Sequence, residues 1–409
     1  MGRTVRGRRE PHLPRVEKIE LSDSHVKGRM AAAVLLLVVG VALIAYSFSK
    51  FLSTDAGWQE IEADAAGEFH CGGDFTFLYE LGKGEASVNS EKKELTALYS
   101  DAAKTAYGIF NADVEIEGVA NLWYLNHHPN EEIVVDEVLY NALSRVSDDG
   151  GRWIYLGPVY SIYDNLFYMS SPDGAVDFDP RLNPVIGELF QEICRFAKDS
   201  EAVNLELMGN STIKLKVSEE YLAFTEAEEL EDFIDFYWMK NAFIVDYLAD
   251  RLLAEGYHHG VISSYDGYVR CLDDRGTIFA YQLYHEQEGM AVLSEVMEYT
   301  DPCSFVSFRS YPLNGLDYRR YLILSDGSVR TPYLSTVDGL DRCSIEELTV
   351  YARNMGCAEI ALKAASVYIA DGFQENTLSS LRETGIYAVY WESGEIRNNG
   401  PVLSIEDED

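Results

Sequence analysis

The sequence predicts a mixed α/β domain of the α+β class, which follows one N-terminal transmembrane helix. Predicted helices alternate with short predicted strands along most of the chain, as expected where helices cover a sheet. Of the 409 residues, 47% are hydrophobic and 12% are aromatic, which is typical of a folded protein with a large core. A long uncharged segment near the N-terminus predicts the membrane helix.

Residues 30–48 hold no charged side chain, and the stretch 31–45 is almost wholly aliphatic. These 19 residues would span about 28 Å as a helix, close to the hydrocarbon thickness of a bilayer. The preceding residues 1–29 hold eight basic and four acidic residues, and a basic flank stays in the cytoplasm. A cleaved signal peptide would have a shorter charged region and a convincing small-residue site after Ala45. We therefore expect an uncleaved single-pass anchor in the cell membrane, with the C-terminal domain extracytoplasmic.

The rest of the chain divides into three segments. Residues 49–66 are expected to form a polar stalk, and residues 401–409 a solvated acidic tail. Between them, residues 67–400 contain no detectable repeat and no low-complexity linker, so we expect one extracytoplasmic domain.

Charge and cysteine content limit the function further. The net charge of −35 would repel nucleic acid and attract cations or basic partners, although it also serves simply to keep an exported protein soluble. Six cysteines lie beyond the anchor and form no C-x-x-C pair, which argues against a zinc site. Their even number permits disulfides without requiring them.

Within the domain, helices are expected where apolar residues recur at helical spacing, and strands where short runs alternate or are rich in apolar residues. The clearest helix is 239–255, in which six apolar side chains share one side. The other expected helices are 90–111, 136–145, 358–364 and 376–383. The expected strands are 75–81, 132–134, 260–263, 268–272, 277–284, 303–309, 348–352 and 386–392.

Five blocks of residues follow one another in an order that is typical of a known family. They are Leu125-Asn126, residues 150–158, residues 235–246, Tyr318-Arg319-Arg320-Tyr321 with the following 331–339, and the strand–helix pair 348–364. In order and spacing they resemble the motifs of the FAD:protein FMN transferase (ApbE) family, across residues 120–395. The resemblance implies an ApbE-like flavin-transferase domain, with FAD and magnesium as its cofactors.

Many positions that carry chemistry in that family hold other residues here. The family's motif histidine falls on Pro332 and its motif aspartate on Ser335. The two residues that hold magnesium in the family fall on Glu359 and Lys363. A Gly-Gly pair falls on Tyr237-Trp238 and a lysine on Asn241, whereas the aspartates at both ends of that block are kept as Asp235 and Asp246.

The resemblance therefore implies Asp235, Asp246 and Asn241 as cofactor-binding candidates and Glu359 as a metal-binding candidate, with no catalytic residue assigned. Glu359 could still reach a magnesium ion, which needs oxygen contacts of about 2.0–2.1 Å. Lys363 lies four residues further on, so we expect an ion pair between these two side chains on one helix face.

Three functions remain open. The leading interpretation is a membrane-anchored, catalytically impaired or inactive relative, a pseudoenzyme, which acts in binding or scaffolding in an envelope process. Its cofactors are either FAD and magnesium or none. The first alternative is an active magnesium-dependent transferase that attaches FMN from FAD to a threonine of a flavin-accepting partner protein. The second is an acidic surface binding domain without a nucleotide. If the resemblance holds, we expect Trp238, Asn241, Glu359 and Lys363 to converge on one cleft.

Overall fold

The structure is a computed structural model that describes residues 55–64, 70–84, 86–168, 172–313, 317, 320–392, 394–400 and 405–406. The predicted leader at 1–29 and anchor at 30–48 lie outside the described residues, as do most of the acidic tail and part of the stalk. Among the helices that are described, none is long and apolar enough to cross a membrane. Residues 55–409 form one unit of the chain.

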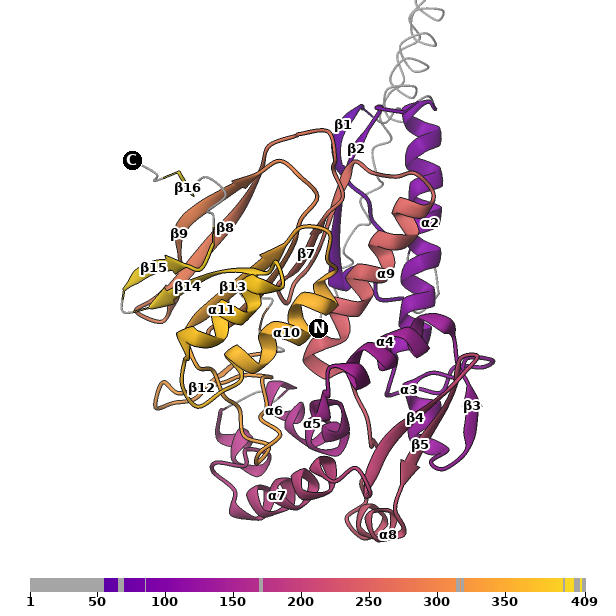
Figure 1. Cartoon of the computed structure of the whole chain (residues 1–409), viewed down its shortest axis with the longest axis vertical. Coiled ribbons are helices and arrows are strands. Elements are labelled where there is room, and N and C mark those ends of the chain that lie inside the picture. The colour runs from indigo at the N-terminus through magenta and orange to yellow at the C-terminus, as the bar shows by residue number, and fades with distance from the viewer. Residues whose placement is uncertain are drawn as a thin grey trace, which may run out of the picture. The chain divides into compact units, whose positions relative to one another are not determined.

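A sheet of eight strands, counted over the described residues, is the centre of this unit (Figure 1). Every neighbouring pair is antiparallel, which makes the domain α+β. In spatial order, the strands are β1 (Gly57–Glu60), β2 (Phe75–Leu81), β6 (Gly260–Ser264), β7 (Tyr268–Cys271), β10 (Ser304–Arg309), β13 (Glu347–Ala352), β14 (Tyr387–Glu392) and β15 (Glu395–Asn398). Strand β1 lies within the segment expected as a stalk, where it forms an edge of the sheet.

Four helices pack side by side against this sheet, each touching the next (Figure 1). They are α2 (Val88–Phe110), α9 (Lys240–Ala254), α10 (Cys357–Tyr368) and α11 (Glu375–Glu383). A hairpin of β8 (Phe279–Gln287) and β9 (Met290–Tyr299) packs against the same sheet through a separate apolar cluster, which includes Met297, Phe305 and Tyr351. Every residue of β10 and β13 is therefore buried.

A second group of elements is inserted between α2 and α9 in the chain. It holds a sheet of three strands within the described part, ordered β3-β5-β4, and several short helices. The elements are α3 (Leu122–His127), β3 (Glu132–Val134), α4 (Glu137–Asp148), α5 (Gly157–Tyr163), α6 (Asn165–Tyr168), α7 (Pro184–Lys198), β4 (Val203–Gly209), β5 (Thr212–Val217) and α8 (Glu219–Ala227). The remaining short strands are β11 (Leu322–Ile323), β12 (Val329–Arg330) and β16 (Ile405–Glu406).

All five predicted helices and all eight predicted strands correspond to observed elements. The helix expected at 239–255 is α9, and the strand expected at 132–134 has the same limits as β3. The sequence patterns missed the strand β9, the hairpin β4–β5 and the helix α7. All six cysteines fall in described ranges and are free thiols, so the disulfides that their even number permits are not formed.

Candidate functional site

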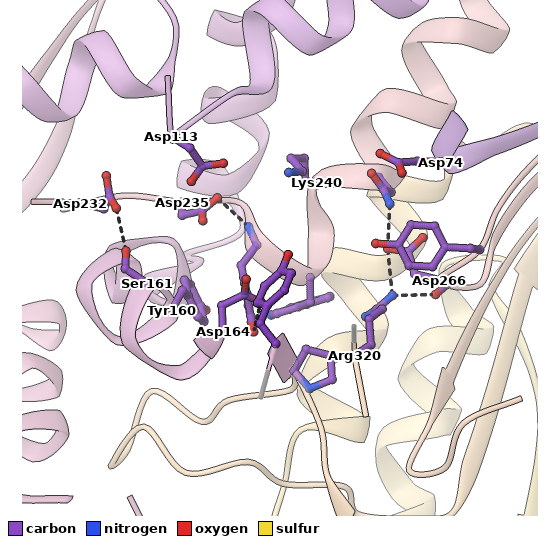
Figure 2. Close-up of a pocket in the computed structure, with 16 residues that line it drawn as sticks. Asp74, Asp113, Tyr160, Ser161, Asp164, Asp232, Asp235, Lys240, Asp266 and Arg320 are labelled. Atoms are coloured by element: carbon purple, nitrogen blue, oxygen red, sulfur yellow. Dashed lines mark hydrogen bonds and ion pairs between the residues drawn. The ribbon is translucent and has the colours of Figure 1, made fainter. Parts of the chain in front are cut away.

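A polar pocket of about 380 Å³ opens beside the first turn of α9. Its walls come from the segment that precedes α9, from α5, from the β6–β7 turn and from the chain between β10 and β13 (Figure 2). Counted over the described residues, its lining includes six aspartates (Asp74, Asp113, Asp164, Asp232, Asp235 and Asp266), two cations (Lys240 and Arg320) and five aromatic residues (Tyr160, Tyr168, Tyr237, Trp238 and Tyr265).

The segment 232–235 is held in place by a buried asparagine that the resemblance singled out. The side chain of Asn126 accepts a hydrogen bond from the Ile234 N–H and donates one to the Ile234 carbonyl, both at 3.0 Å. Gly157 at the start of α5 lets this segment approach closely, because a Cβ there would lie 2.3 Å from the Asp232 carbonyl oxygen. These two contacts fix one wall of the pocket.

Asp235, a predicted cofactor-binding residue, lines the pocket. Its carboxylate accepts a hydrogen bond from the Tyr237 N–H at 2.9 Å. Burial raises the pKa of Asp235 to about 6; Lys240 opposes the shift, whereas Asp113 and Asp232 add to it. An aspartate with such a pKa changes its charge within the range in which histidine usually does.

Asn241, the second predicted residue in the pocket, belongs to a buried polar chain. Its Nδ2 donates to Asp266 Oδ2 at 3.1 Å, and Arg320 Nη1 forms an ion pair with the same oxygen at 2.8 Å. Arg320 also donates to the Asp266 carbonyl at 3.2 Å. Two buried atoms of this chain, Asp266 Oδ1 and Arg320 Nη2, have no hydrogen-bond partner among the described residues.

Lys240 also lines the pocket, beside Asn241. Figure 2 shows its side chain between Asp113 and Asp235 on one side and Asp74 on the other. Burial alone would lower the pKa of Lys240, but Asp235, Asp113 and Asp74 raise it above its ordinary value. Lys240 therefore carries a positive charge into an acidic pocket.

Tyr237 and Trp238 line the pocket and also pack against other rings. Tyr237 has a φ of 42°, a left-handed backbone that favours glycine, and its ring stacks on Tyr160 at 4.3 Å. Trp238 is 3% exposed and packs against Trp153 and Phe308. The backbone at 237 thus keeps a shape suited to glycine while carrying a large side chain.

Asp246, the third predicted cofactor-binding residue, lies outside this pocket. Its carboxylate accepts hydrogen bonds from the N–H groups of Cys357 at 2.7 Å and Ala358 at 3.0 Å, at the start of α10. It also forms an ion pair with Arg270 at 3.2 Å. In this structure, Asp246 joins α9 to α10.

Glu359 and Lys363 do not lie in the pocket either. Glu359 is exposed on α10, and no ion pair joins it to Lys363 within the described part of the chain, so the expected pair is absent. No group of three or more acidic, histidine or cysteine side chains that could hold a metal ion occurs among the described residues. The geometry therefore does not fit a magnesium site at Glu359. Of the four side chains expected to converge, only Trp238 and Asn241 do so.

The fold and the pocket together describe an α+β domain with a polar pocket at the first turn of α9. No protein-family model matches the chain, and no curated protein sequence matches it. Solved structures do. The ApbE protein of Thermotoga maritima is 13% identical, with a TM-score of 0.55, and the match covers 83% of this chain and 96% of that one.

Two further structures agree. The flavin transferase ApbE of Vibrio cholerae is 13% identical with a TM-score of 0.55, over 86% of this chain and 98% of that one. The apo flavinyl transferase ApbE of Pseudomonas stutzeri is 13% identical with a TM-score of 0.52, over 84% and 94%. The chain therefore has the fold of the ApbE flavin transferases, as the resemblance implied.

Proposed function

We propose that this chain is a binding protein built on the flavin-transferase fold, and that it does not transfer FMN. The observation that carries the proposal is the charge of the pocket. Six aspartates line it against two cations, counted over the described residues.

This charge balance opposes the binding of a pyrophosphate such as that of FAD. Two like charges 4 Å apart repel by roughly 4 kcal/mol at the effective dielectric constant near a protein surface. Transferases that handle phosphoryl groups offset this repulsion with metal ions and basic side chains. Here Arg320 is already paired with Asp266, and Lys240 is surrounded by carboxylates.

The proposal extends to the location of the protein. The uncharged segment 30–48 and its basic flank support a single membrane anchor with the domain on the extracytoplasmic side. An envelope protein is the partner class that this location favours, and the strongly acidic chain argues against nucleic acid.

One observation favours a second function, an active FAD:protein FMN transferase. Asp235 and Asn241 remain in the pocket together with Lys240 and Arg320, so two cations are present beside the candidate cofactor-binding residues. In that case, FAD and magnesium would supply the reacting phosphate and its counter-ion. Lys240 and Arg320 would be the residues to neutralise the phosphate oxygens.

One experiment separates these functions. The full-length chain, purified in detergent, is incubated with FAD and magnesium, and AMP release is followed by chromatography beside the Vibrio cholerae flavin transferase as a positive control. We expect no AMP above the protein-free blank and no flavin absorbance retained after gel filtration. AMP release by this chain would overturn the proposal, because it would show that the pyrophosphate of FAD is cleaved. A fluorescent flavin band on an added acceptor protein would then establish transfer of FMN.

A further inference from the structure

We propose that the pocket binds a small organic cation, a primary amine or guanidinium compound. This inference rests on the proposed function, because it assigns the pocket to a ligand other than FAD. It names the ligand class that the proposed function leaves open.

The first reason is an unbalanced charge at one end of the pocket. Asp113, Asp232 and Asp235 gather there (Figure 2). The Asp232 carboxylate accepts a hydrogen bond from Ser161 Oγ at 2.6 Å, which is a neutral donor. Burial raises the pKa of Asp232, with Asp113 adding to the shift, so these carboxylates repel one another. Lys240 lies beside Asp113 and Asp235 and offsets part of this repulsion, so a further cation would relieve the rest.

The second reason is independent of net charge. Asp266 is 7% exposed and lines the pocket, and its Oδ1 has no hydrogen-bond partner among the described residues. Leaving a buried polar atom unpaired is unfavourable, because it has lost its contact with water. An ammonium or guanidinium group carries several N–H donors and would satisfy this oxygen.

The neighbouring Arg320 adds a matching donor. It is 6% exposed, and its Nη2 has no hydrogen-bond partner in the part of the chain that the structure describes. A ligand that also carries a hydroxyl or carboxylate oxygen would accept from this group. Such an acceptor would add to the binding, but the N–H donors of an amine are sufficient for Asp266 Oδ1.

Aromatic rings form the third part of the pocket wall. Tyr160 and Tyr237 stack at 4.3 Å, and Tyr265 lies in the β6–β7 turn beside Asp266. Organic cations are attracted to the faces of such rings, more strongly the further they are desolvated. Carboxylates combined with aromatic rings are therefore suited to an organic cation.

The size of the pocket suits a small molecule, and its side chains disfavour two other ligand classes, divalent metal ions and anions. A cavity of about 380 Å³ lies within the range of small-molecule pockets, roughly 300–1,000 Å³. No group of side chains that could hold a metal ion occurs among the described residues, which disfavours a divalent cation. An anion would meet more carboxylates than cations.

Lys240 competes with such a ligand. Its ammonium group is placed among Asp74, Asp113 and Asp235, and it partly neutralises them. Removing its charge would make the pocket more negative by one unit. Affinity for an external cation should then increase, a change that damage to the fold would not produce.

The test is isothermal titration calorimetry, in which 1,5-diaminopentane is titrated into the full-length chain in detergent and the heat of binding is measured. We expect saturable binding that weakens as salt is raised, because the attraction is between charges. Three compounds serve as matched controls. Pentane-1,5-diol has a similar shape without the charge, glutarate carries the opposite charge, and magnesium chloride supplies an inorganic cation. Equal binding of the diol, or no heat with the diamine at millimolar concentration, would overturn the inference.

Three variants make the test specific to the pocket. We expect Asp266→Asn to weaken diamine binding about tenfold or more, because it removes a charged hydrogen-bond acceptor. Lys240→Met should strengthen diamine binding. Asp301→Asn removes one charge from a surface ion pair with Arg353 and should leave the affinity for the diamine unchanged. Unchanged affinity in both Asp266→Asn and Lys240→Met would overturn the assignment to this pocket.

Failure of this inference is distinguishable from failure of the proposed function. If neither diamine binding nor AMP release from FAD is seen, the proposed cation site is wrong, whereas the proposal that the chain does not transfer FMN stands. If the diamine binds and AMP is also released, the proposed function is wrong and the cation site stands.

Discussion

The carboxylate of Asp246 accepts a hydrogen bond from the N–H of Cys357 at 2.7 Å, which ties the middle of α9 to the first residue of α10. The free N–H groups at a helix start need acceptors, and a buried carboxylate there also meets the positive end of the helix dipole. Asp246 is 6% exposed and pairs with Arg270 in addition. A residue expected to hold a cofactor thus connects two helices that cover the central sheet.

Replacing Asp246 by alanine should destabilise the domain by about 2–4 kcal/mol, because two buried N–H groups and Arg270 lose their acceptor. Thermal unfolding followed by circular dichroism measures this. Asp250→Ala is the matched control, since Asp250 pairs with the same arginine at 2.8 Å but is 63% exposed. We expect less than about 1 kcal/mol there. Equal losses in the two variants would contradict the linking role.

Gly356 should tolerate no side chain, because it lies directly against the carboxylate of Asp246. An added Cβ would lie 2.2 Å from Asp246 Oδ2, far inside van der Waals contact. Gly356→Ala should therefore cost about 1–3 kcal/mol in the wild-type background. In the Asp246→Ala background, the clash disappears, so the Gly356→Ala substitution should cost only a few tenths of a kcal/mol. A double-mutant cycle measures this coupling, and additive effects would show that the contact is not the cause.

Much of the fold could be predicted because local patterns decide it. The helix α9 has an apolar side, and β13 is a short apolar run, so both were expected within a few residues of their observed limits. The strand β9 was missed because most of its residues are half-buried, without regular alternation. The helix α7 carried a usable signal, since Asn183 caps it and Pro184 is its first residue.

The site was harder to predict, because its carboxylates come from segments far apart in the chain. The motif block 235–246 identified Asp235 and Asn241, which do line the pocket. Nothing in the sequence placed Asp74 or Asp113 beside them. The motif block did not single out Lys240, which borders the pocket together with Asn241 where α9 begins directly after a 3-10 turn. A motif therefore located one wall, and only the tertiary fold supplies the others.

Glu359 provides a sharp test of the magnesium hypothesis. It is exposed and has no neighbouring set of metal ligands among the described residues, so Glu359→Ala should change stability by less than about 0.5 kcal/mol. When FAD is present, we also expect magnesium to shift the melting temperature of this variant by the same amount as that of the wild type. Glu359→Gln serves as the matched control for charge alone. If magnesium stabilises the FAD-treated wild type and not these variants, Glu359 is a metal ligand after all.

Tyr237 should be replaceable by glycine at less cost than a buried tyrosine normally incurs. Removing a fully buried aromatic ring costs about 3–5 kcal/mol, and Tyr237 is only partly buried. A left-handed backbone at a non-glycine residue stores about 1–2 kcal/mol that glycine releases. The Tyr237→Gly variant should therefore lose at most about 1–4 kcal/mol. Tyr237→Ala keeps the strain and loses the same stacking on Tyr160, so it should be less stable than Tyr237→Gly. The opposite order in urea unfolding would refute this.

Asp235 should make the stability of the domain depend on pH. Its pKa is about 6 in the folded state, because burial outweighs the attraction of Lys240, and lies near 3.9 in an unfolded chain. Between these values, the folded state binds more protons than the unfolded state, so this contribution is full below about pH 4 and is lost as the pH rises through 6.

Asp235→Asn removes the titration, so the loss of stability between pH 4 and pH 7 should be smaller in that variant than in the wild type, by about 2 kcal/mol. Other carboxylates titrate in the same range, and for that reason the difference between proteins is the quantity to measure. Asp301→Asn, which removes an exposed carboxylate, should follow the wild-type profile. Parallel profiles for the wild type and Asp235→Asn would mean that the pocket leaves Asp235 with an ordinary pKa, and the electrostatic strain inferred for this end of the pocket would be absent.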